Sequence, residues 1–313
     1  MRLIGFVVAL VFATLSYAPA YSADKLTVLL DWFVNPDHAA LIIAEKRGLF
    51  EEADLDVELV APADPSAPPR LVAAGQAELA ISYQPQLHVQ ASEGLGLARV
   101  ATLAETPLNA LVALKDGPVK SIADLKGKTV GFSVGGFEDA LLAAMLKGAG
   151  LSLDDVNLVN INFSLSPSLI SGKVDAVIGA FRNFELNQLD IEGQSGIAFY
   201  PEENGVPVYD ELIVVARRDS VDDPRIPRFL DAIEEATLWL TNHPDEAWEI
   251  FAASGSDLDN ELNRRAWYDT LPRLAKRPAA LDSRRYERFA KFMKASGLIE
   301  EIPPLDSYAV EVK

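Results

Sequence analysis

The chain has 313 residues, of which 49% are hydrophobic and 24% charged, and these proportions are those of a folded protein long enough for two domains. Its 46 Asp and Glu against 28 Lys and Arg give a net charge of -18, which repels nucleic acid and anionic membrane surfaces. The absence of cysteine excludes disulfides, thiolate nucleophiles and cysteine-bound metals, and the 3 histidines are too scattered in sequence to indicate a metal site.

The first 22 residues have the features of an export signal. Met1 and Arg2 give a positive start, residues 3–15 are apolar but too short to span a bilayer, and Ala18-Pro19-Ala20 matches the small-residue pattern of a cleavage site. We therefore predict a signal peptide over residues 1–22 and a mature protein in the periplasm or a similar compartment. Cleavage after Ala20 or Ala23, and retention of the segment as an anchor, are the alternatives.

Beyond Lys25, short β-rich runs alternate with longer amphipathic stretches. The apolar patterns predict strands over residues 26–30, 57–60, 79–82, 100–103 and 110–114, with helices over 38–49, 70–74 and 86–93. They then predict strands over 129–132, 156–161 and 174–178, with helices over 137–147, 167–170 and 184–191. After a strand over 211–216 the pattern becomes mostly helical. This order is typical of an α/β protein with two successive units.

Two segments share one pattern. Residues 75–81 and 172–178 each consist of Gly, any residue, a small apolar residue, an acid and then an apolar run. A helix that ends at Gly and passes directly into a buried strand has this pattern. The repeat indicates two related lobes, and chance similarity of a common junction is the alternative.

Turn residues mark the expected boundaries between the lobes. Lys115-Asp116-Gly117-Pro118 closes the first unit, and Gly205-Val206-Pro207 precedes the strand near residue 211. We expect lobe 1 to consist of residues 23–115 and 209–313, with residues 116–208 inserted as lobe 2. Ligands of open α/β sheets bind at the carboxyl ends of the strands, so the sequence predicts a hinged, two-lobed clamp with a cleft between the lobes.

The loop after the first strand is rich in polar and aromatic residues. It runs from Asp31 and Trp32 through Asn35 to His38, and a Trp beside an acid suits stacking on a planar heterocycle. Tyr83 follows the strand over 79–82 and is placed to form an opposite wall. The alternative for both aromatic residues is ordinary packing at the edge of the core.

Two segments of the second unit also follow strands. Gly135 and Gly136 lead into a helix, where free backbone N–H groups favour an anion or a carbonyl oxygen, although a tight turn alone would also need glycine. Glu185 follows the strand over 174–178, and its carboxylate can accept from an amino group beside a ring nitrogen, the edge that an aminopyrimidine presents. A surface ion pair with Arg182 is the alternative.

At these segments the chain resembles a known family. The segments that carry the resemblance are Leu29-Leu30-Asp31-Trp32-Phe33, Asn35-Pro36-Asp37-His38, Gly48-Leu49-Phe50-Glu51-Glu52 with Leu55-Asp56-Val57, Leu125-Lys126-Gly127-Lys128-Thr129-Val130-Gly131 and Asn183-Phe184-Glu185. They are similar to those of periplasmic binding proteins that deliver thiamine pyrimidine precursors to ABC transporters, a family related to the fungal enzyme that makes hydroxymethylpyrimidine phosphate. The third and fourth segments also occur in relatives that bind nitrate or sulfonates, and so indicate the fold only.

The resemblance implies roles for single residues. Trp32 and Tyr83 would bracket a pyrimidine ring, Glu185 and Asp31 would read its amino edge, and Tyr209 would approach from the second crossing. The full ligand-binding set that we predict is Asp31, Trp32, Asn35, His38, Tyr83, Gly135, Gly136, Asn183, Phe184, Glu185 and Tyr209. We predict no catalytic residue, metal or cofactor. Val34 departs from the family, in which proline is usual at this place.

Two classes of function are open to such a chain. We expect a monomeric solute-binding protein of an ABC importer, with a permease and an ATPase as partners, that binds formylaminopyrimidine or hydroxymethylpyrimidine. A riboflavin-like heterocycle, a sulfonate, nitrate, or a sensor role on the same clamp are the alternatives. A synthase of the fungal kind needs a lysine for pyridoxal phosphate after Ile81 and a cysteine-rich iron site, whereas Ser82 and Tyr83 follow Ile81 and the chain has no cysteine. We therefore expect no enzymatic activity.

Overall fold

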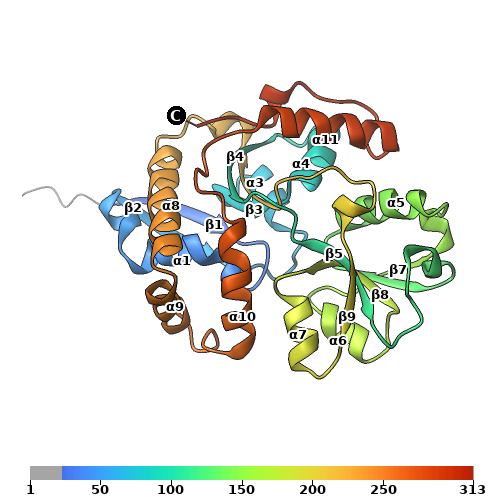
Figure 1. Cartoon of the computed structure of the whole chain (residues 1–313). Helices are drawn as coiled ribbons and strands as arrows, with labels where there is room; N and C mark the ends of the chain where they lie inside the picture. Colours follow the sequence, from blue (N-terminus) through green and yellow to red (C-terminus); the bar gives the residue numbers. More distant parts are fainter. Residues whose placement is uncertain (1–22, 313) are drawn as a thin grey trace, which may run out of the picture.

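The computed structural model describes residues 23–312, so the predicted signal peptide lies outside the described residues. The chain forms two lobes, each built on a five-stranded mixed sheet with helices packed against it (Figure 1). Within residues 23–312, no helix is both long and apolar enough to cross a membrane.

The first lobe is built on strands from both ends of the chain. Its sheet has the order β2-β1-β3-β10-β4. The strands are β1 (Asp24–Leu29), β2 (Leu55–Val60), β3 (Leu79–Ser82), β4 (Leu97–Ala104) and β10 (Leu212–Arg217). β1 is parallel to β2 and β3, whereas β10 is antiparallel to β3 and β4. The carboxyl ends of β1 and β3 therefore meet at one edge of the sheet.

The second lobe repeats this spatial arrangement of strands with an unbroken stretch of chain, although its antiparallel strand β5 comes first in sequence whereas β10 comes last. Its sheet has the order β7-β6-β8-β5-β9. The strands are β5 (Asn109–Leu114), β6 (Thr129–Phe132), β7 (Asn157–Asn160), β8 (Ala176–Phe181) and β9 (Gly196–Phe199). β6 is parallel to β7 and β8, and β5 is antiparallel to β8 and β9. β6 and β8 thus correspond to β1 and β3 of the first lobe.

The repeated sequence pattern has the same structural role in both lobes. Gly75 and Gly172 have left-handed φ values of 73° and 71° and follow α3 (Pro68–Ala73) and α6 (Leu165–Ile170). The acid of each pattern then accepts a hydrogen bond from the neighbouring parallel strand. Glu78 accepts from the Thr27 N–H of β1 at 2.9 Å, and Asp175 accepts from the Thr129 N–H of β6 at 2.9 Å. These acids are part of the framework rather than of a binding site.

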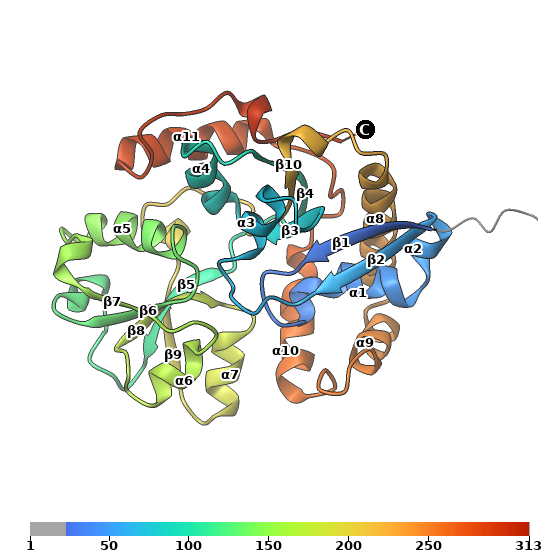
Figure 2. The same ribbon diagram turned by 180° about the vertical axis from the view of Figure 1, so that it is seen from behind.

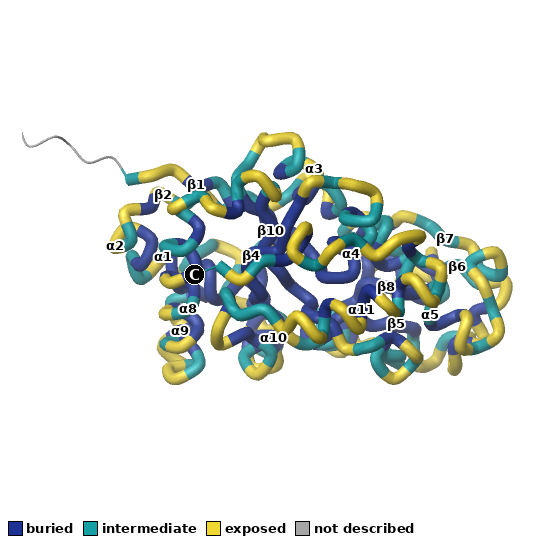
Figure 3. Tube along the Cα trace, turned by 90° about the horizontal axis from the view of Figure 1, so that it is seen from above, coloured by how far each residue is buried: buried dark blue, intermediate teal, exposed yellow. Residues whose placement is uncertain are grey.

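Helices cover the sheets and extend the first lobe. Those not yet given are α1 (Ala39–Lys46), α2 (Leu49–Glu52), α4 (Gln84–Ser92), α5 (Glu138–Gly148), α7 (Glu185–Ile191), α8 (Arg225–Asn242), α9 (Pro244–Ala253), α10 (Glu261–Thr270) and α11 (Ser283–Ser296). α8 packs beside α1 and α2, and Phe50 of α2 stacks on Phe229 of α8 with ring centroids 5.4 Å apart. Figure 2 shows α10 facing α7 across the two lobes, and Figure 3 shows the buried chain running through the sheets.

Two of these elements, β9 and α10, were not predicted from the sequence patterns.

The first crossing between the lobes comes earlier than the sequence predicted. Residues 110–114 were expected in lobe 1, but β5 pairs with β8 and β9 in the second sheet, so the chain crosses at residues 105–108. The turn after Lys115 stays within the second lobe, since it joins β5 to β6 of the same sheet and the Lys115 N–H donates to the Ser195 carbonyl oxygen at 2.7 Å. The second crossing lies at residues 200–211, an interval that includes the predicted boundary at 209.

One carboxyl group joins the two crossings. Glu211, at the end of the second crossing, accepts hydrogen bonds from the Leu108 N–H at 2.6 Å and the Asn109 N–H at 2.9 Å at the end of the first. Glu211 is fully buried, and burial raises its pKa to about 7. Both chain segments that connect the lobes are therefore held at one point.

We predict that Glu211→Ala destabilises the fold. The substitution leaves two buried N–H donors without an acceptor, and each unsatisfied donor lowers the free energy of unfolding by about 1–3 kcal/mol. Glu211→Gln retains an acceptor oxygen and is the matched control. Thermal unfolding should give a lower midpoint for the alanine variant than for the glutamine variant, and equal midpoints would show that Glu211 does not hold the crossings.

Candidate ligand-binding site

A pocket lies between the lobes, at the carboxyl ends of the parallel strands. The first lobe contributes residues that follow β1 and β3, and the second lobe contributes residues on or after β6 and β8, with one from α6. The lining residues are Asp31, Trp32, Asn35, Asp37 and Tyr83 from the first lobe and Glu138, Leu165, Gly179, Phe181, Phe184 and Glu185 from the second. This is the place where the ligand cleft of a two-lobed α/β clamp is expected.

Asp31 organises the first-lobe wall. Its Oδ2 accepts from the Tyr83 hydroxyl at 2.8 Å, and its Oδ1 lies 2.9 Å from His38 Nε2. The Asn35 N–H donates to His38 Nδ1 at 3.3 Å, so Nδ1 is unprotonated and Nε2 carries the hydrogen that Asp31 accepts. Both oxygens of Asp31 are thus engaged in holding Tyr83 and His38, and His38 stands behind Asp31 rather than in the pocket lining.

Asp37 and Asn183 join the two lobes at the pocket. The Asn183 side-chain amide donates to Asp37 Oδ1 at 2.6 Å and to the Thr270 hydroxyl at 2.7 Å, and this hydroxyl also donates to Asp37 Oδ1 at 3.1 Å. Burial raises the pKa of Asp37 to about 6. Because Asn183 precedes α7 while Thr270 ends α10, this cluster connects the second lobe to a helix near the C-terminus.

Glu185 is the first residue of α7 and is buried in the pocket. Its Oε2 accepts from the Phe181 N–H at the end of β8, at 2.6 Å. Among the described residues, no side chain donates to its other oxygen, and burial raises the pKa of Glu185 to about 8. One carboxyl oxygen is therefore available to a ligand.

Glu138 has the equivalent position at the start of α5. Its Oε2 accepts from the Ser133 N–H at the end of β6, at 2.6 Å, and burial raises its pKa to about 8. Its side chain lies against the backbone of Gly179 on β8, where an added Cβ would be 2.3 Å from the Glu138 carboxyl carbon. Gly179 also has a left-handed φ of 99°, so both its conformation and this close approach require glycine.

Aromatic rings complete the walls of the pocket. Tyr83 stacks on Phe137 with ring centroids 4.5 Å apart and an interplanar angle of 11°. Trp32 meets Phe163 of the second lobe edge-on at 4.6 Å. Trp32 and Tyr83 both line the pocket, but one face of Tyr83 is already covered by Phe137.

The lobes are closed around this pocket in the structure. The free space among the lining side chains is about 20 Å³, which is room for little more than one water molecule. Contacts between α7 and α10 reinforce the closure, with Asn187 donating to Asp269 at 2.9 Å and Arg265 paired with Asp190 at 2.6 Å. A ligand larger than water therefore needs the lobes to separate.

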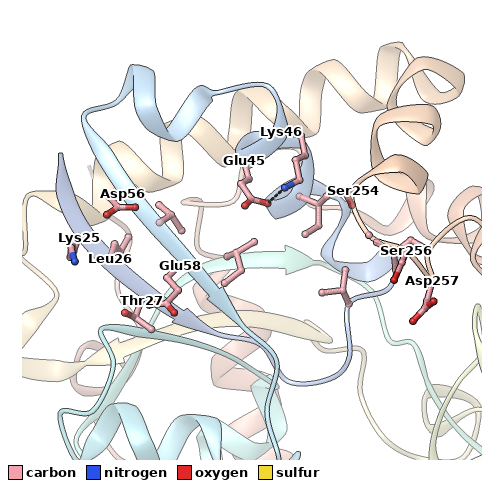
Figure 4. Close-up of a pocket in the computed structure, with 16 residues that line it drawn as sticks. Lys25, Leu26, Thr27, Glu45, Lys46, Asp56, Glu58, Ser254, Ser256 and Asp257 are labelled. Atoms are coloured by element: carbon pink, nitrogen blue, oxygen red, sulfur yellow. Dashed lines mark ion pairs between the residues drawn. The ribbon is translucent and has the colours of Figure 1, made fainter. Parts of the chain in front are cut away.

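A larger surface hollow lies beside β1 and β2 (Figure 4). Its free space is about 700 Å³, and its wall is formed by β1, β2, α1 and the loop over residues 254–258. Lys46 at its rim is paired with the neighbouring Glu45 at 3.2 Å. The hollow is open to solvent, whereas the interlobe pocket gathers buried acids and aromatic rings, so we assign the binding site to the pocket despite its smaller volume.

The structure brings most of the predicted residues together. Asp31, Trp32, Asn35, Tyr83, Phe184 and Glu185 line the pocket, and His38 and Asn183 hold lining residues in place. Arg182 pairs with Glu202 at 2.6 Å rather than with Glu185, so the alternative role for Glu185 as a surface ion pair is wrong.

Three predicted residues do not line the pocket. Tyr209 is fully buried in the first lobe, where its ring packs against Phe289 at 5.4 Å. Gly135 and Gly136 form the turn into α5, and Gly136 needs its left-handed φ of 76°. The Ser133 N–H beside this turn already donates to the Glu138 carboxyl, so it is not available to an anion. This contact argues against the predicted anion-binding role of the turn.

Sequence reasoning had assigned no ligand-binding role to Asp37, Glu138, Leu165, Gly179 or Phe181. A signal for Glu138 was present, because it stands at the start of a helix that follows a strand, as Glu185 does. Leu165 and Gly179 offer no such signal, since their place in the lining depends on how α6 and β8 pack.

The family described as NMT1/THI5 like matches residues 35–247 of the chain. A Haemophilus influenzae protein whose name links it to thiamine biosynthesis is 54% identical over 100% of this chain and 99% of its own. The formylaminopyrimidine-binding protein of Halalkalibacterium halodurans is 32% identical over 83% of this chain and 81% of its own. A 4-amino-5-hydroxymethyl-2-methylpyrimidine phosphate synthase of Legionella pneumophila is 23% identical over 89% of this chain and 88% of its own.

Solved structures share the fold. The alkanesulfonate-binding protein SsuA of Xanthomonas axonopodis pv. citri, bound to MOPS, has a TM-score of 0.69 at 17% identity, covering 90% of this chain and 95% of that one. The periplasmic aliphatic sulphonate binding protein SsuA of Escherichia coli has a TM-score of 0.67 at 15% identity, covering 93% and 94%. The chain therefore has the two-lobed periplasmic-binding-protein fold that the sequence predicted.

From the raised pKa values of the buried acids we predict that the ligand-free protein loses stability as pH rises. Folding raises the pKa of Asp37 to about 6, of Glu211 to about 7, and of Glu138 and Glu185 to about 8. Each raised pKa contributes stability that is fully present below the unfolded value near pH 4 and is lost as pH rises through the folded value. Urea unfolding should show the free energy of unfolding falling by at least about 2 kcal/mol between pH 5 and pH 9.

The double variant Glu138→Gln with Glu185→Gln is the control for this measurement, because it removes two of the titrating groups and should flatten the decline. A free energy of unfolding that rises from pH 5 to pH 9 in the natural protein would contradict the electrostatic account.

Proposed function

Because the chain belongs to the NMT1/THI5-like family, we propose that it is the solute-binding protein of an ABC importer and that its pocket takes a thiamine pyrimidine precursor, formylaminopyrimidine or hydroxymethylpyrimidine. In this proposal the protein is exported by its N-terminal segment, acts as a monomer, and delivers its ligand to a permease driven by an ATPase.

The observation that carries the proposal is the free oxygen of Glu185 in an aromatic pocket. An aminopyrimidine presents an amino donor beside a ring nitrogen, and a carboxyl oxygen accepts from that amino group. Trp32 and Tyr83 line the same pocket and offer ring faces or edges to a planar heterocycle. The name of the Halalkalibacterium halodurans relative, which is 32% identical, points to the same class of ligand.

The lining argues against nitrate and sulfonates. Four lining residues are acids, and within the described lining there is no Lys, Arg or His. The N–H of Ser133, which an anion would use, already donates to Glu138 at 2.6 Å. A buried carboxyl and an anionic ligand both present acceptors, so their contact is unfavourable. The likeness to sulfonate-binding structures therefore supports the fold and not their ligands.

A synthase activity is the second candidate, because relatives at 23% identity carry that name. Strand β3 ends at Ser82 and is followed by Tyr83 and Gln84, with no lysine there to form a Schiff base. The described residues also contain no cluster of three His, Cys, Asp or Glu side chains placed to hold a metal ion. The chain's own residues offer recognition groups at the pocket, and binding is the function that they support best.

We predict that Trp32→Ala weakens binding of an aminopyrimidine at least tenfold, which corresponds to about 1.4 kcal/mol. The loss follows from removing one aromatic wall of the pocket. Trp239→Ala is the matched control, because Trp239 lies on α8, away from the pocket. The guanidinium carbon of Arg47 lies 4.2 Å from the centroid of the Trp239 ring. Calorimetry that gives equal dissociation constants for both variants and the natural protein would remove Trp32 from the site.

Glu185→Gln separates the pyrimidine proposal from anion binding. The glutamine oxygen must accept from the Phe181 N–H, as Glu185 Oε2 does at 2.6 Å, so the amide NH₂ would face the pocket. This donor opposes the amino group of an aminopyrimidine, and we expect affinity to fall by about 1.5–3 kcal/mol. The same donor should leave the affinity for nitrate or a sulfonate unchanged or improve it.

Glu192→Gln, at the exposed C-terminal end of α7, is the control for this test. Dissociation constants for a pyrimidine and a sulfonate should be measured with all three proteins. Measurable sulfonate binding that tightens in Glu185→Gln, without pyrimidine binding by the natural protein, would overturn the proposed function.

A further inference from the structure

Helix α11 has a basic outer face in an otherwise acidic protein. The whole chain has a net charge of -18, yet residues 273–294 contain eight Lys and Arg against two Asp and Glu. α11 buries Tyr286, Phe289, Ala290 and Met293, so its apolar side faces the first lobe. Figure 1 shows the helix along the outside of that lobe, with α4 beneath it.

Four basic residues form a row on the opposite side of the helix. Arg284, Arg288, Lys291 and Lys294 are spaced four, three and three residues apart, and all four are exposed. Residues three or four apart share one face of an α-helix, so these side chains point away from the core together. Glu287 is the single acid of α11. We call the four basic residues the basic row.

The basic row has no acid of this chain to neutralise it. Other arginines of the first lobe are paired, as Arg228 is with Asp24 at 2.5 Å. Arg285, the neighbour of Arg284, pairs with the buried Asp210. Within residues 23–312, no member of the basic row makes an ion pair. The four positive charges are therefore available to an anionic partner.

The composition of this face favours a lipid surface over an acidic protein. A protein interface has a core of buried apolar and aromatic side chains. The exposed large apolar side chains of the described residues lie on other segments, and none of them is on α11. Long basic side chains on the outer face of an amphipathic helix are the pattern that binds anionic phospholipid head groups. The basic row therefore fits a flat array of phosphate groups better than a protein partner.

The negative charge of the rest of the chain sets the orientation of such a contact. At physiological ionic strength, exposed charges interact over about 8 Å. A lipid surface that meets α11 therefore interacts chiefly with the basic row, whereas a surface that meets an acidic face is repelled. The net charge excludes contact through most of the molecular surface and leaves α11 as the face that approaches an anionic membrane.

We propose that the basic row of α11 docks the protein on the anionic phospholipid head groups of a membrane. The contact is electrostatic and reversible, because α11 keeps its apolar side buried against the first lobe. α11 packs on α4 of the first lobe and has no comparable contact with any described element of the second lobe, so docking leaves the second lobe free to move. The proposal goes beyond the proposed function and holds whichever solute the pocket takes.

The test is co-sedimentation of the protein with lipid vesicles. Vesicles of phosphatidylglycerol mixed equally with phosphatidylcholine should bind the natural protein, and vesicles of phosphatidylcholine alone should bind it at least tenfold less. Raising the salt concentration from about 0.15 M to about 1 M shortens the Debye length from about 8 Å to about 3 Å and should release the protein. The neutral vesicles also report any binding through the apolar residues 3–15, which every variant shares.

Two variants that lose the same charge locate the contact. The row variant combines Arg284→Gln, Arg288→Gln, Lys291→Gln and Lys294→Gln, and its affinity for the anionic vesicles should fall at least tenfold. The matched control removes four exposed lysines of the second lobe and should bind as the natural protein does. It combines Lys120→Gln, Lys126→Gln, Lys147→Gln and Lys173→Gln. Thermal unfolding midpoints close to that of the natural protein show that both variants are folded.

The outcomes decide between three accounts of the basic row. Equal vesicle binding by the row variant and the lysine control would overturn the role of α11. A natural protein that does not bind the phosphatidylglycerol vesicles, but does bind soluble polyglutamate, would assign the basic row to an acidic protein segment and overturn the lipid surface. Binding to neither would overturn docking through this face altogether. None of these results depends on the ligand of the pocket, so the proposed function is tested separately.

Discussion

The carboxyl groups of Glu138 and Glu185 are subject to one electrostatic constraint. Each is buried at the start of a helix and receives a backbone N–H from the end of the strand before it, at 2.6 Å in both cases. Backbone donors do not offset the loss of water around these carboxylates, and the described lining has no cation. Both groups therefore favour their neutral forms when the site is empty, and a ligand that brings donors or positive charge satisfies them.

The repeated topology of the lobes creates this constraint. Strands β6 and β8 are parallel neighbours in the second sheet, so the helices that follow them start side by side at one edge. The first lobe brings Asp31 and Tyr83 to the facing edge through its own parallel pair, β1 and β3. Glu211 fixes the two chain crossings behind the pocket. The two acids of the second lobe thus face a wall that carries Asp31 and Asp37 together with an aromatic hydroxyl and an indole.

Local sequence patterns predicted the strands, most helices and the loops that carry the pocket, because hydrophobic periodicity and turn residues are local signals. Trp32, Tyr83 and Glu185 converge because each follows a parallel strand. The placement of β5 was missed, since the turn at residues 115–118 has the same composition whichever sheet the preceding strand joins. Tyr209 was misplaced and Thr270 was overlooked for a related reason, as their partners Phe289 and Asn183 are distant in sequence.

The most direct test of the account is a thermal-shift comparison of the natural protein with two classes of ligand at neutral pH. Aminopyrimidines that are precursors of thiamine should raise the unfolding midpoint, since a ligand at a hundred times its dissociation constant stabilises by about 2.7 kcal/mol. Nitrate and alkanesulfonates should leave the midpoint unchanged. A rise with an alkanesulfonate or nitrate, and none with any aminopyrimidine, would contradict the account.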